Sequence, residues 1–591
     1  MDTTETPVLV VGGGPVGLLL SILLDAQGVD HLVVERRAGV QEAPAAHVVN
    51  ARTFEILRAA GVDATRLDAA CMPVADGAWV RWVTSLTGTE LGRVPFERQD
   101  RLDELDAITP TPLRNLSQPR LEAILRDRVA LAPRARHLVG VEWLDAELVD
   151  DRTTDDRTDR VVSRVRDVAT GEVVEVTSTW LVAADGAGSP VRRWAGIEME
   201  GPTRLKATLS IHVEADLRAT IGDRPATLYW VDGGVFVAHD LDRTWVFMHD
   251  WDPDAETLDD YPPERCEAIF RAAAGLDGPE HADLPIAVRA ATPWMMTCQV
   301  ARSYREGPVL LVGDAAHRFP PTGGLGLNTG AVDAQNLAWK LGAVHRGEAA
   351  PALVDTYELE RRPIAADNAR CSLENALRML EVPEAIASGD PAAVTAAIEA
   401  QAGHFDLLGL QLGFAYEASP AATAGSGLPA VVVADGTGPE PLADPARDHR
   451  PGTRPGQRLP HAWVARVTRD ARGGRPEEVV STLDLVPPDR FVLLTASPAW
   501  AAAGRSLVAD GMRLDVVHLG VDVRDRTGAW AAVAGVANAG ALLVRPDQHV
   551  LWRAAGMAAD PALTLRRVLA GALGTGASPE RPPPARPMAR V

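Results

Sequence analysis

The segment from Val309 to Lys340 constrains the fold of this chain more strongly than any other part of the sequence. An apolar run over 309–312 indicates a buried strand, and a loop dense in glycine and proline follows it. From about Gly330 the apolar residues recur at the spacing of one buried helix face. A strand, a loop that brings backbone close to a ligand, and a helix N-terminus together form an anion-binding site. Asp314 suits a sugar hydroxyl instead, because an ionised carboxylate only accepts hydrogen bonds. The alternative is an ordinary strand, loop and helix without a ligand.

The N-terminal part of the chain carries a second pattern of this kind. An apolar strand over 8–11 runs directly into the GxGxxG sequence at 12–17, and an almost entirely apolar helix is predicted over 15–26. A second strand over 32–34 ends in Glu35. The glycines allow a tight turn and close approach of a pyrophosphate, and the acid accepts a hydrogen bond from a ribose hydroxyl. This pattern predicts a dinucleotide site. Its contacts are expected at Gly12, Gly14, Pro15, Val16, Gly17, Glu35 and Arg36, the last with a solvated surface position as its alternative.

The string that begins at Gly313, GDAAHRFPPTGGLGLNTGAVDAQNLAWKL, resembles the second flavin-binding motif of a known family. This family is the FAD-dependent aromatic hydroxylases, which are single-component group A flavoprotein monooxygenases. Two further stretches resemble the same family and occur in its order: NARTFE at 50–55 and WLVAADGAGSPVRR at 180–193. The resemblance covers about residues 7–375.

The resemblance implies which residues contact FAD. Arg52 is expected at the flavin or a phosphate, Gln118 at the ribityl chain, and Asp185 with Gly186 near FAD and the path of the nicotinamide cofactor. Arg52 has a surface position at a helix start as its alternative. Gln118 lies in the first turn of a helix predicted over 116–129, and the alternative is that it is only part of this helix start and does not contact FAD. The remaining contacts expected from the second motif are Gly313, Asp314, Pro321, Gly324, Gly326, Leu327 and Asn328.

The chemistry of the family follows from the same resemblance. NADPH or NADH, bound transiently, reduces FAD, and O2 then adds at the flavin C4a carbon to give a hydroperoxide. The distal oxygen is transferred to a phenolic or otherwise hydroxylated (hetero)aromatic ring. Proline has no N–H that could protonate the peroxide, so the Pro321 carbonyl is the expected hydrogen-bond acceptor near it. The composition, rich in Ala, Arg and Gly, suggests a high-GC bacterial genome. Hydroxylases of such organisms often act in secondary metabolism, including antibiotic biosynthesis.

The expected fold is α/β, with a Rossmann-type FAD-binding domain interleaved with a β-sheet substrate domain. A C-terminal α/β domain resembles, more loosely, the thioredoxin-like domain of the phenol hydroxylase and dichlorophenol monooxygenase-like branch. Strands at 491–495, 514–519 and 541–544 support it. No cysteine lies beyond Cys371, so thiol-disulfide chemistry is excluded there. The expected boundaries are 1–80, 105–198 and 301–416 for the FAD-binding domain, 81–104 and 199–300 for the substrate domain, 417–454 for a linker, 455–575 for the thioredoxin-like domain and 576–591 for a disordered tail.

Apolar and polar residues alternate in several stretches of 199–300, and such alternation predicts strands. The resulting sheet is expected to cover the flavin and hold the substrate. Tyr229 and His249 are the candidate catalytic residues, and a structural place in a strand is the alternative for each. Alternation alone does not say which face of the sheet meets the pocket. Further polar candidates are His212, His239, Asp250 and Trp294.

The composition excludes some partners. A net charge of −21 argues against nucleic acid or an anionic membrane. Four cysteines lie far apart without paired or metal-ligand spacing, which argues against a metal site and favours a reducing cytoplasm. The N-terminus lacks a basic region and a long apolar run, so neither a signal peptide nor a membrane span is predicted. The expected partners are a small aromatic substrate, O2, NAD(P)H and further copies of the chain in a homo-oligomer. A charge run at 150–160 is expected to be a solvated hairpin tip.

Three alternative functions are weighed against hydroxylation: one remains open and two are disfavoured. The same flavin chemistry can insert oxygen into a polyketide ketone, as in Baeyer–Villiger reactions, and the motifs would be identical. Flavin-dependent halogenation is disfavoured, because Trp79 and Trp82 lack the spacing and the Ile-Pro of the halogenase motif. A non-catalytic binding protein is disfavoured by the intact loop over 320–328. Analysis of the product distinguishes hydroxylation from ketone oxidation. A purified protein that cannot take up FAD would support the alternative of a non-catalytic binding protein.

Overall fold

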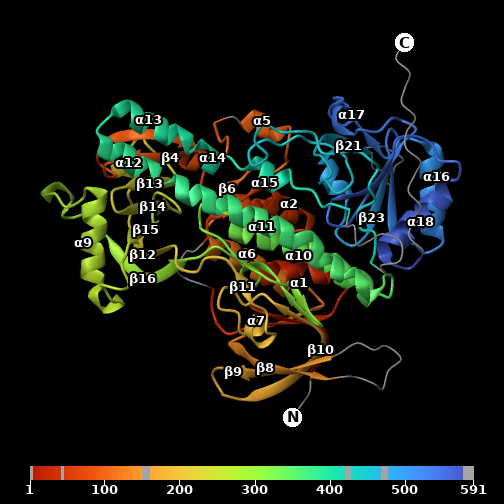
Figure 1. The fold of residues 1–591 in the computed structure, drawn as a ribbon, viewed down its shortest axis with the longest axis horizontal. Helices are drawn as coiled ribbons and strands as arrows, with labels where there is room; N and C mark the ends of the chain where they lie inside the picture. Colours follow the sequence, from red (N-terminus) through yellow and green to blue (C-terminus); the bar gives the residue numbers. More distant parts are fainter. Residues whose placement is uncertain are drawn as a thin grey trace.

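The computed structural model describes residues 4–40, 46–100, 102–149, 160–418, 428–467 and 477–576. Two long helices, α10 (Leu325–His345) and α11 (Asp355–Arg378), cross the middle of the molecule (Figure 1). The C-terminal domain, blue in Figure 1, lies at one end, and the sheet that contains β12 to β16 lies at the other. The predicted hairpin tip over 150–159 and the tail over 577–591 lie outside the described residues.

The FAD-binding domain is built on a sheet whose parallel strands come from distant parts of the chain. The carboxyl-terminal halves of β1 and β10 and all of β2 and β19 are buried, which explains their continuous apolar sequences, whereas the edge strand β7 is largely exposed. The predicted strands at 8–11, 32–34 and 309–312 are confirmed. In spatial order the parallel strands are β19 (Val309–Leu311), β10 (Val173–Ala183), β1 (Thr4–Val11), β2 (His31–Glu35) and β7 (Ala135–Val139).

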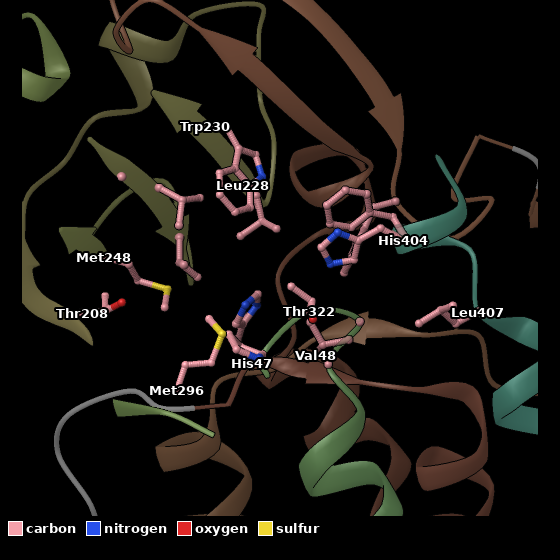
Figure 2. A pocket seen from close by; sticks show the side chains of 18 of the residues that line it. His47, Val48, Thr208, Leu228, Trp230, Met248, Met296, Thr322, His404 and Leu407 are labelled. Atoms are coloured by element: carbon pink, nitrogen blue, oxygen red, sulfur yellow. The ribbon is translucent and has the colours of Figure 1, made fainter. Parts of the chain in front are cut away.

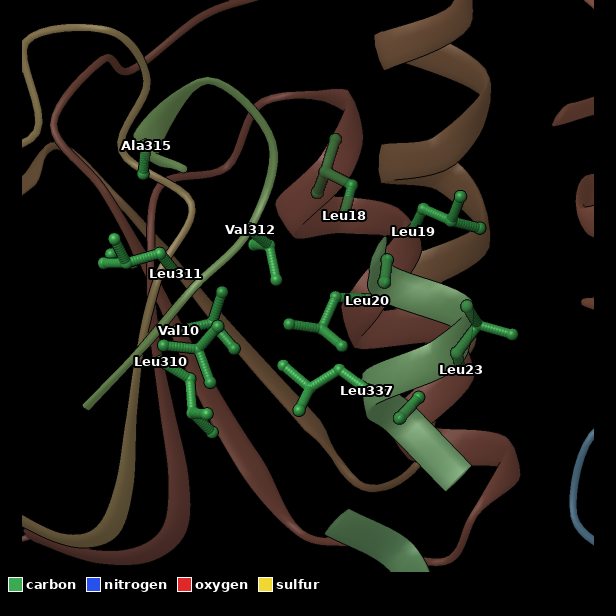
Figure 3. Packing of buried hydrophobic residues seen from close by; sticks show 14 of the residues in the cluster. Val10, Leu18, Leu19, Leu20, Leu23, Leu310, Leu311, Val312, Ala315 and Leu337 are labelled. Atoms are coloured by element: carbon green, nitrogen blue, oxygen red, sulfur yellow. The ribbon is translucent and has the colours of Figure 1, made fainter. Parts of the chain in front are cut away.

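Helices α1 (Pro15–Ala26) and α10 pack together against this sheet. Leu20 of α1 and Leu337 of α10 face Val10 and Leu310 of the strands, and all four side chains are buried (Figure 3). Burying one such side chain contributes roughly 1.5–3 kcal/mol. Pro15 occupies the first turn of α1, where its missing N–H would have had no partner within the helix. The predicted bounds of this helix are confirmed.

The predicted substrate domain contains a seven-stranded sheet that combines two distant segments of the chain. Helix α9 (Pro263–Ala274), which the sequence analysis did not predict, covers one face with Cys266 and Phe270. The other face borders a cavity described below. In spatial order the strands are β16 (Ala287–Met296), β12 (Lys206–Glu214), β15 (Thr244–Asp250), β14 (Gly234–Ala238), β13 (Leu228–Val231), β4 (Trp79–Val83) and β5 (Glu90–Pro95).

The C-terminal domain has the strand arrangement expected for a thioredoxin-like unit. Strands β23 and β24 are parallel and flank helix α16, whereas β26 and β27 form an antiparallel hairpin followed by α18. Trp339 of α10 packs into the core of this domain, and its ring lies 5.9 Å from that of Phe491. The bounds are β23 (Phe491–Thr495), α16 (Pro498–Ala509), β24 (Leu514–His518), β26 (Ala541–Val544), β27 (Val550–Ala554) and α18 (Pro561–Leu573).

Two expectations about chain organisation need correction. Helix α10 begins at Leu325 rather than near Gly330, because Gly324 adopts a left-handed φ of +62° and forms the N-cap. The described part of the expected linker packs into the C-terminal domain: Val431 is buried there, and the Val433 N–H donates to the Leu551 carbonyl at 2.9 Å. Within the described ranges, none of the helices has the length and apolar character needed to cross a membrane.

Candidate active site

Parallel strands bring the predicted FAD motifs to one edge of the sheet. Strands β1, β10 and β19 are in register, so that Val11 lies opposite Ala183, and Ala183 lies opposite Leu311. The first glycine motif, the aspartate-glycine pair and the second motif each follow one of these strands directly. Glu35 ends β2 at the same edge. In open α/β sheets, ligands bind outside the carboxyl ends of the strands.

The glycines of the first motif leave room for a ligand. Gly12 has φ +110°, and a Cβ there would lie 2.2 Å from the Ala184 carbonyl oxygen. A Cβ on Gly17 would lie 2.0 Å from the Gly12 carbonyl oxygen, so this glycine lets α1 pack closely on the turn. A Cβ on Gly14 would meet nothing within 4 Å. Open backbone at the N-terminus of a buried helix fits the pyrophosphate of FAD.

Glu35 is held as an ionised acceptor at the end of β2. Its carboxylate accepts hydrogen bonds from the Gly13 N–H at 2.7 Å and from the Arg37 N–H at 2.8 Å. Burial alone would raise the pKa of Glu35, but these two N–H groups and the Arg37 guanidinium lower it below its ordinary value. An ionised carboxylate here suits a ribose hydroxyl. Arg36, beside it, is exposed.

Two further carboxyl groups fit the hydroxyls of a bound dinucleotide. Asp185 accepts from the Val191 N–H at 3.1 Å, whereas its other oxygen is buried without a hydrogen-bond partner among the described residues. Burial raises the pKa of Asp185, and a hydroxyl donor would satisfy its unpaired oxygen. The Asp314 residue is exposed, but the protein packed around its carboxyl group removes part of the hydration of that group and so raises its pKa. A Cβ on Gly326 would meet only the Asp314 Oδ1, at 4.0 Å, and a Cβ on Gly186 would meet nothing.

The first and second motifs contact each other through Val16. A Cβ on Gly330 would lie 2.7 Å from the Val16 side chain, and one on Gly313 would lie 3.2 Å from it. Glycine at both positions therefore lets α1 and the second motif approach closely. Leu327 lies half-buried in the first turns of α10, between these contacts and the cavity loop.

Asn328 ties the second motif to the segment that contains Asn50. Its Oδ1 accepts from the Asn50 N–H at 3.0 Å and the Thr53 hydroxyl at 2.7 Å. Its amide nitrogen donates to the carbonyls of Val48, at 2.9 Å, and Gly324, at 2.6 Å. The structure therefore uses this side chain to position the loop, and only its backbone is available for the predicted FAD contact.

Pro321 lies at the end of the loop that faces the cavity. Its carbonyl accepts a hydrogen bond from the Gly324 N–H at 3.1 Å, which closes a tight turn. Thr322 fixes this turn to α11, because its hydroxyl donates to the Ser372 carbonyl at 2.6 Å. Pro321 therefore presents a backbone carbonyl and no N–H donor at a rigid position.

Arg52, expected at the flavin or a phosphate, makes buried contacts with other parts of the protein. Its guanidinium is fully buried and donates to Glu55, Gln335 and Gln548, with distances of 3.0, 2.8 and 2.7 Å. The residue joins α2 (Ala51–Ala59) to the C-terminal domain, whose presence no local pattern around Arg52 reveals.

Gln118 makes protein contacts with both ends of its amide. Its Oε1 accepts from the Ala46 N–H at 3.2 Å, and its Nε2 donates to Glu122 at 2.8 Å. It does begin α6 (Gln118–Ala130), as predicted.

A cavity lies between the substrate sheet, the loop at 321–324 and the segment around His404 (Figure 2). The empty space amounts to about 920 Å³, part of it open to solvent. Lys206 and Asp250, whose charged groups lie 2.6 Å apart, are half-exposed and border the cavity. Most of the wall is apolar: Val48, Phe96, Leu113, Leu228, Trp230, Val235, Val237, Met248, Met296, Phe405 and Leu407.

Tyr229 and His249 were predicted as catalytic candidates, and the structure places both side chains outside the lining of this cavity. Successive side chains of a strand point to opposite faces, so Leu228, Trp230 and Met248 line the cavity while Tyr229 and His249 face away. The Tyr229 hydroxyl donates to the Arg224 carbonyl at 2.9 Å. The His249 ring lies against Phe247 and Tyr261, on the side of the sheet that α9 covers.

The analysis of the sequence missed three polar residues of the cavity wall. His47 and His404 line the cavity, and burial lowers their pKa to about 4 and about 3, so both imidazoles are neutral at pH 7. Burial raises the pKa of Glu97 to about 8. None of the three lies in an alternating strand of 199–300. His47 does precede the NARTFE segment closely, which was the one available signal.

Comparison with known proteins identifies the class of enzyme. The model of an FAD binding domain matches residues 5–372, and that of an aromatic-ring hydroxylase C-terminal domain matches 452–576. Tetracenomycin A2 monooxygenase-dioxygenase of Streptomyces glaucescens is 34% identical, covering 97% of this chain and 99% of the relative. A 2,4-dichlorophenol 6-monooxygenase of Cupriavidus pinatubonensis is 33% identical, covering 96% and 97%. The crystal structure of the flavin-dependent monooxygenase PieE with FAD and substrate superposes with a TM-score of 0.85 at 33% identity, covering 97% and 99%.

The chain therefore belongs to the FAD-dependent aromatic-ring hydroxylases. It is a flavoprotein monooxygenase whose cofactor is FAD, with NAD(P)H as the co-substrate typical of the family. The family, fold class, enzyme class and cofactor predicted from the sequence are confirmed.

Proposed function

We propose that this enzyme hydroxylates a multi-ring aromatic compound that carries a ring hydroxyl, as part of secondary metabolism. The observation that carries this proposal is the cavity beside the second FAD motif. The cavity extends from the loop at 321–324 along the substrate sheet to the segment around His404, and the rings of Phe96, Trp230 and Phe405 line it. The names of the relatives include both a polyketide oxygenase and a chlorophenol oxygenase. They therefore support the reaction, whereas the size of the substrate is inferred from the cavity.

The walls of the cavity suit a flat ring system. Trp230 and Phe405 line the cavity, and both pack on the buried ring of Trp82, at ring distances of 6.4 and 6.3 Å. Met248 and Met296 add adaptable apolar contacts, which fill irregular space around a ring. Burying aromatic surface against such walls provides affinity and also excludes water from the site.

The chain's own residues bind the cofactor and shape the reaction site. Bound FAD supplies the transfer of electrons from NAD(P)H to O2, which no side chain can perform. Glu35, Asp185 and Asp314 would accept hydrogen bonds from its hydroxyl groups, and the open backbone at Gly14 would hold its pyrophosphate. Pro321 borders the cavity and has no N–H donor, and the apolar wall would keep bulk water from the reacting atoms.

The test is a comparison of phenol with 1,8-dihydroxyanthraquinone as substrates of the FAD-loaded enzyme. We expect the three-ring compound to have a kcat/KM at least about tenfold higher, which corresponds to about 1.4 kcal/mol of additional binding in the transition state. Trp230→Ala should reduce this preference without loss of FAD. Faster turnover of phenol would contradict the proposed substrate class.

The proposal includes a homo-oligomer in the cytoplasm. All four cysteines are free and buried, which supports a reducing compartment. Leu377, Leu380 and Ile386 are exposed on neighbouring helices, which supports an apolar contact between copies of the chain. Sedimentation equilibrium of the purified enzyme tests this part, and a monomer at every concentration would contradict it.

A further inference from the structure

His47 occupies a special position in the cavity wall. It lies directly before β3 (Val48–Val49), and the Val48 carbonyl accepts a hydrogen bond from Asn328 of the second FAD motif. A Cβ on Gly324 would lie 2.7 Å from the Val48 Cβ, so this segment also packs on the loop that faces the cavity. In Figure 2 the His47 side chain lies beside Val48 and Met296 on the same side of the cavity. The imidazole is therefore close to both the FAD motif and the space for a substrate.

Asn115 fixes which nitrogen of His47 carries the proton. The Asn115 amide nitrogen donates to the Ala238 carbonyl at 2.8 Å and contacts the Met72 sulfur at 3.2 Å. Its Oδ1 must therefore face the His47 Nδ1, which lies 3.3 Å away. An amide oxygen only accepts hydrogen bonds, so Nδ1 carries the hydrogen and donates it. The lone pair of the neutral imidazole is then on Nε2.

The surroundings of His47 favour its neutral form until a negative partner arrives. Burial lowers the pKa of His47, and the hydrogen bond to Asn115 offsets this only in part. The His239 ring lies 5.4 Å away, edge to face, and burial lowers its pKa well below the ordinary value too. Arg120 also lowers the pKa of His239, and its guanidinium is paired with Asp240 at 2.6 Å. An anionic oxygen next to Nε2 would compensate the charge of an imidazolium.

The other ionisable groups of the wall already have partners. Asp250 is paired with Lys206 at 2.6 Å. Glu97 accepts a hydrogen bond from the Gln411 amide with one carboxyl oxygen, and its other oxygen is buried without a partner among the described residues. The His404 Nδ1 lies 3.2 Å from the Met379 sulfur, and its ring stacks on Phe405 at 4.1 Å. Within the described lining of the cavity, His47 thus combines a defined free lone pair with a place beside the FAD motif.

We propose that His47 is a catalytic residue that accepts the proton of the substrate's ring hydroxyl at its Nε2. This inference rests on the proposed function. The O–H bond breaks, an N–H bond forms at Nε2, and the oxygen keeps the electron pair. The resulting phenolate and imidazolium form a pair with no net charge added to the cavity. The phenolate enriches the ring in electrons and so favours its oxygenation. The oxygenated ring regains aromaticity when its C–H bond at the oxygenated carbon breaks: the electron pair re-enters the ring, the ring oxygen becomes a phenolate again, and the proton leaves to water. Nε2 then returns its proton to that phenolate oxygen.

The first test compares the wild type with His47→Gln, and uses Tyr229→Phe on the opposite face of the sheet as a control. Both variants should retain FAD. With 1,8-dihydroxyanthraquinone we expect His47→Gln to lower kcat by about 100-fold at neutral pH, the lower end of the usual effect of a proton-transfer residue. The loss should shrink as the pH rises toward the point where the free substrate ionises. An equal loss at all pH values, or no loss, would overturn the proposal. A wild type that oxidises no hydroxylated ring would instead refute the proposed function.

The second test needs no turnover. The absorption of 1,8-dihydroxyanthraquinone moves to longer wavelength when its hydroxyl ionises, so the bound compound reports its own proton. In the FAD-loaded wild type without NAD(P)H, we expect ionised absorption at a lower pH than for the free compound. His47→Gln should bind the compound and lose this shift. Bound compound that ionises at the same pH in both proteins would overturn the assignment of His47, and a compound not retained by the wild type would contradict the proposed substrate class.

Discussion

Replacing Glu55 by glutamine tests how the C-terminal domain is joined to the FAD-binding domain. The Glu55 carboxylate is fully buried and holds two buried guanidinium groups. Arg52 lies 3.0 Å from it, and Arg458, which belongs to the C-terminal part of the chain, donates to it at 2.8 and 2.5 Å. The Thr109 hydroxyl donates at 2.7 Å. Glu55→Gln keeps the shape of the side chain and removes the only charge that compensates this pair directly.

The expected loss of stability is about 3–5 kcal/mol, the usual result of removing one partner of a buried ion pair. Arg52 retains acceptors on Gln335 and Gln548, whereas the Arg458 guanidinium retains only the Ile108 carbonyl, at 3.3 Å, among the described residues. Most of the cost should therefore come from Arg458. Adding Arg458→Met to Glu55→Gln should recover part of the stability, because it removes a buried unpaired charge.

The pH dependence of this effect follows from the pKa of Glu55. Burial would raise this pKa, but Arg458 and Arg52 outweigh burial and lower it below the ordinary value. Its contribution to stability is fully present above the pKa of the unfolded chain, about 4.3, and is lost as the pH falls through the lower pKa of the folded state. The difference between wild type and variant should therefore narrow in acid.

Guanidinium chloride unfolding, followed by tryptophan fluorescence, measures the change. The midpoint of the transition that separates the C-terminal domain should fall in Glu55→Gln at pH 7. Arg66→Gln is the control, because its pair with Asp127 is exposed on both sides and such pairs contribute little. An unchanged midpoint in Glu55→Gln, or no recovery on adding Arg458→Met, would refute the reasoning.

Three further predictions concern the site. Asp314→Ala should weaken FAD retention, because it removes an acceptor for a cofactor hydroxyl; full flavin absorbance after gel filtration would contradict this. Gly324→Val should also reduce flavin content, since its Cβ would lie 2.7 Å from the Val48 Cβ and φ is +62°; wild-type content would show that the loop adapts. Burial raises the pKa of Glu97 to about 8, so the stability of the wild type should decrease as the pH rises from the ordinary pKa of a glutamate to about 8. Glu97→Gln should therefore be more stable than wild type at pH 9 and similar at pH 4, and parallel pH profiles of the two melting temperatures would refute this.

The sequence was sufficient for the parts of the fold that depend on local patterns. The strand before Gly12, helix α1 and the strand before Asp314 each have a continuous apolar sequence with a glycine-rich end, and their bounds agree closely with the structure. Helix α10 was placed too far along the chain, because glycines at 326 and 330 weaken the helical pattern that packing against Val16 stabilises. Helix α9 lies within a segment that was interpreted only through its alternating strands.

The candidate site was harder to predict, because it depends on contacts between distant residues. Period-2 alternation identified the strands of Tyr229 and His249 and could not tell which face met the cavity. A displacement of one position, to Trp230 and Met248, reaches the cavity. Arg52 was predicted to bind the flavin or a phosphate because the sequence around it resembles the family motif. Its buried partners, among them Gln548, come from the C-terminal domain, and the local sequence gives no sign of them.

The most direct test of the central claim is NAD(P)H oxidation by the FAD-loaded enzyme across a panel of hydroxylated aromatic compounds, with product and hydrogen peroxide quantified together. We expect one class of multi-ring compound to accelerate NAD(P)H oxidation and to gain one oxygen on the ring, with little peroxide released. Oxygen inserted next to a ketone would favour the Baeyer–Villiger alternative. Release of all reducing power as peroxide across the whole panel would contradict the account of a coupled aromatic hydroxylase.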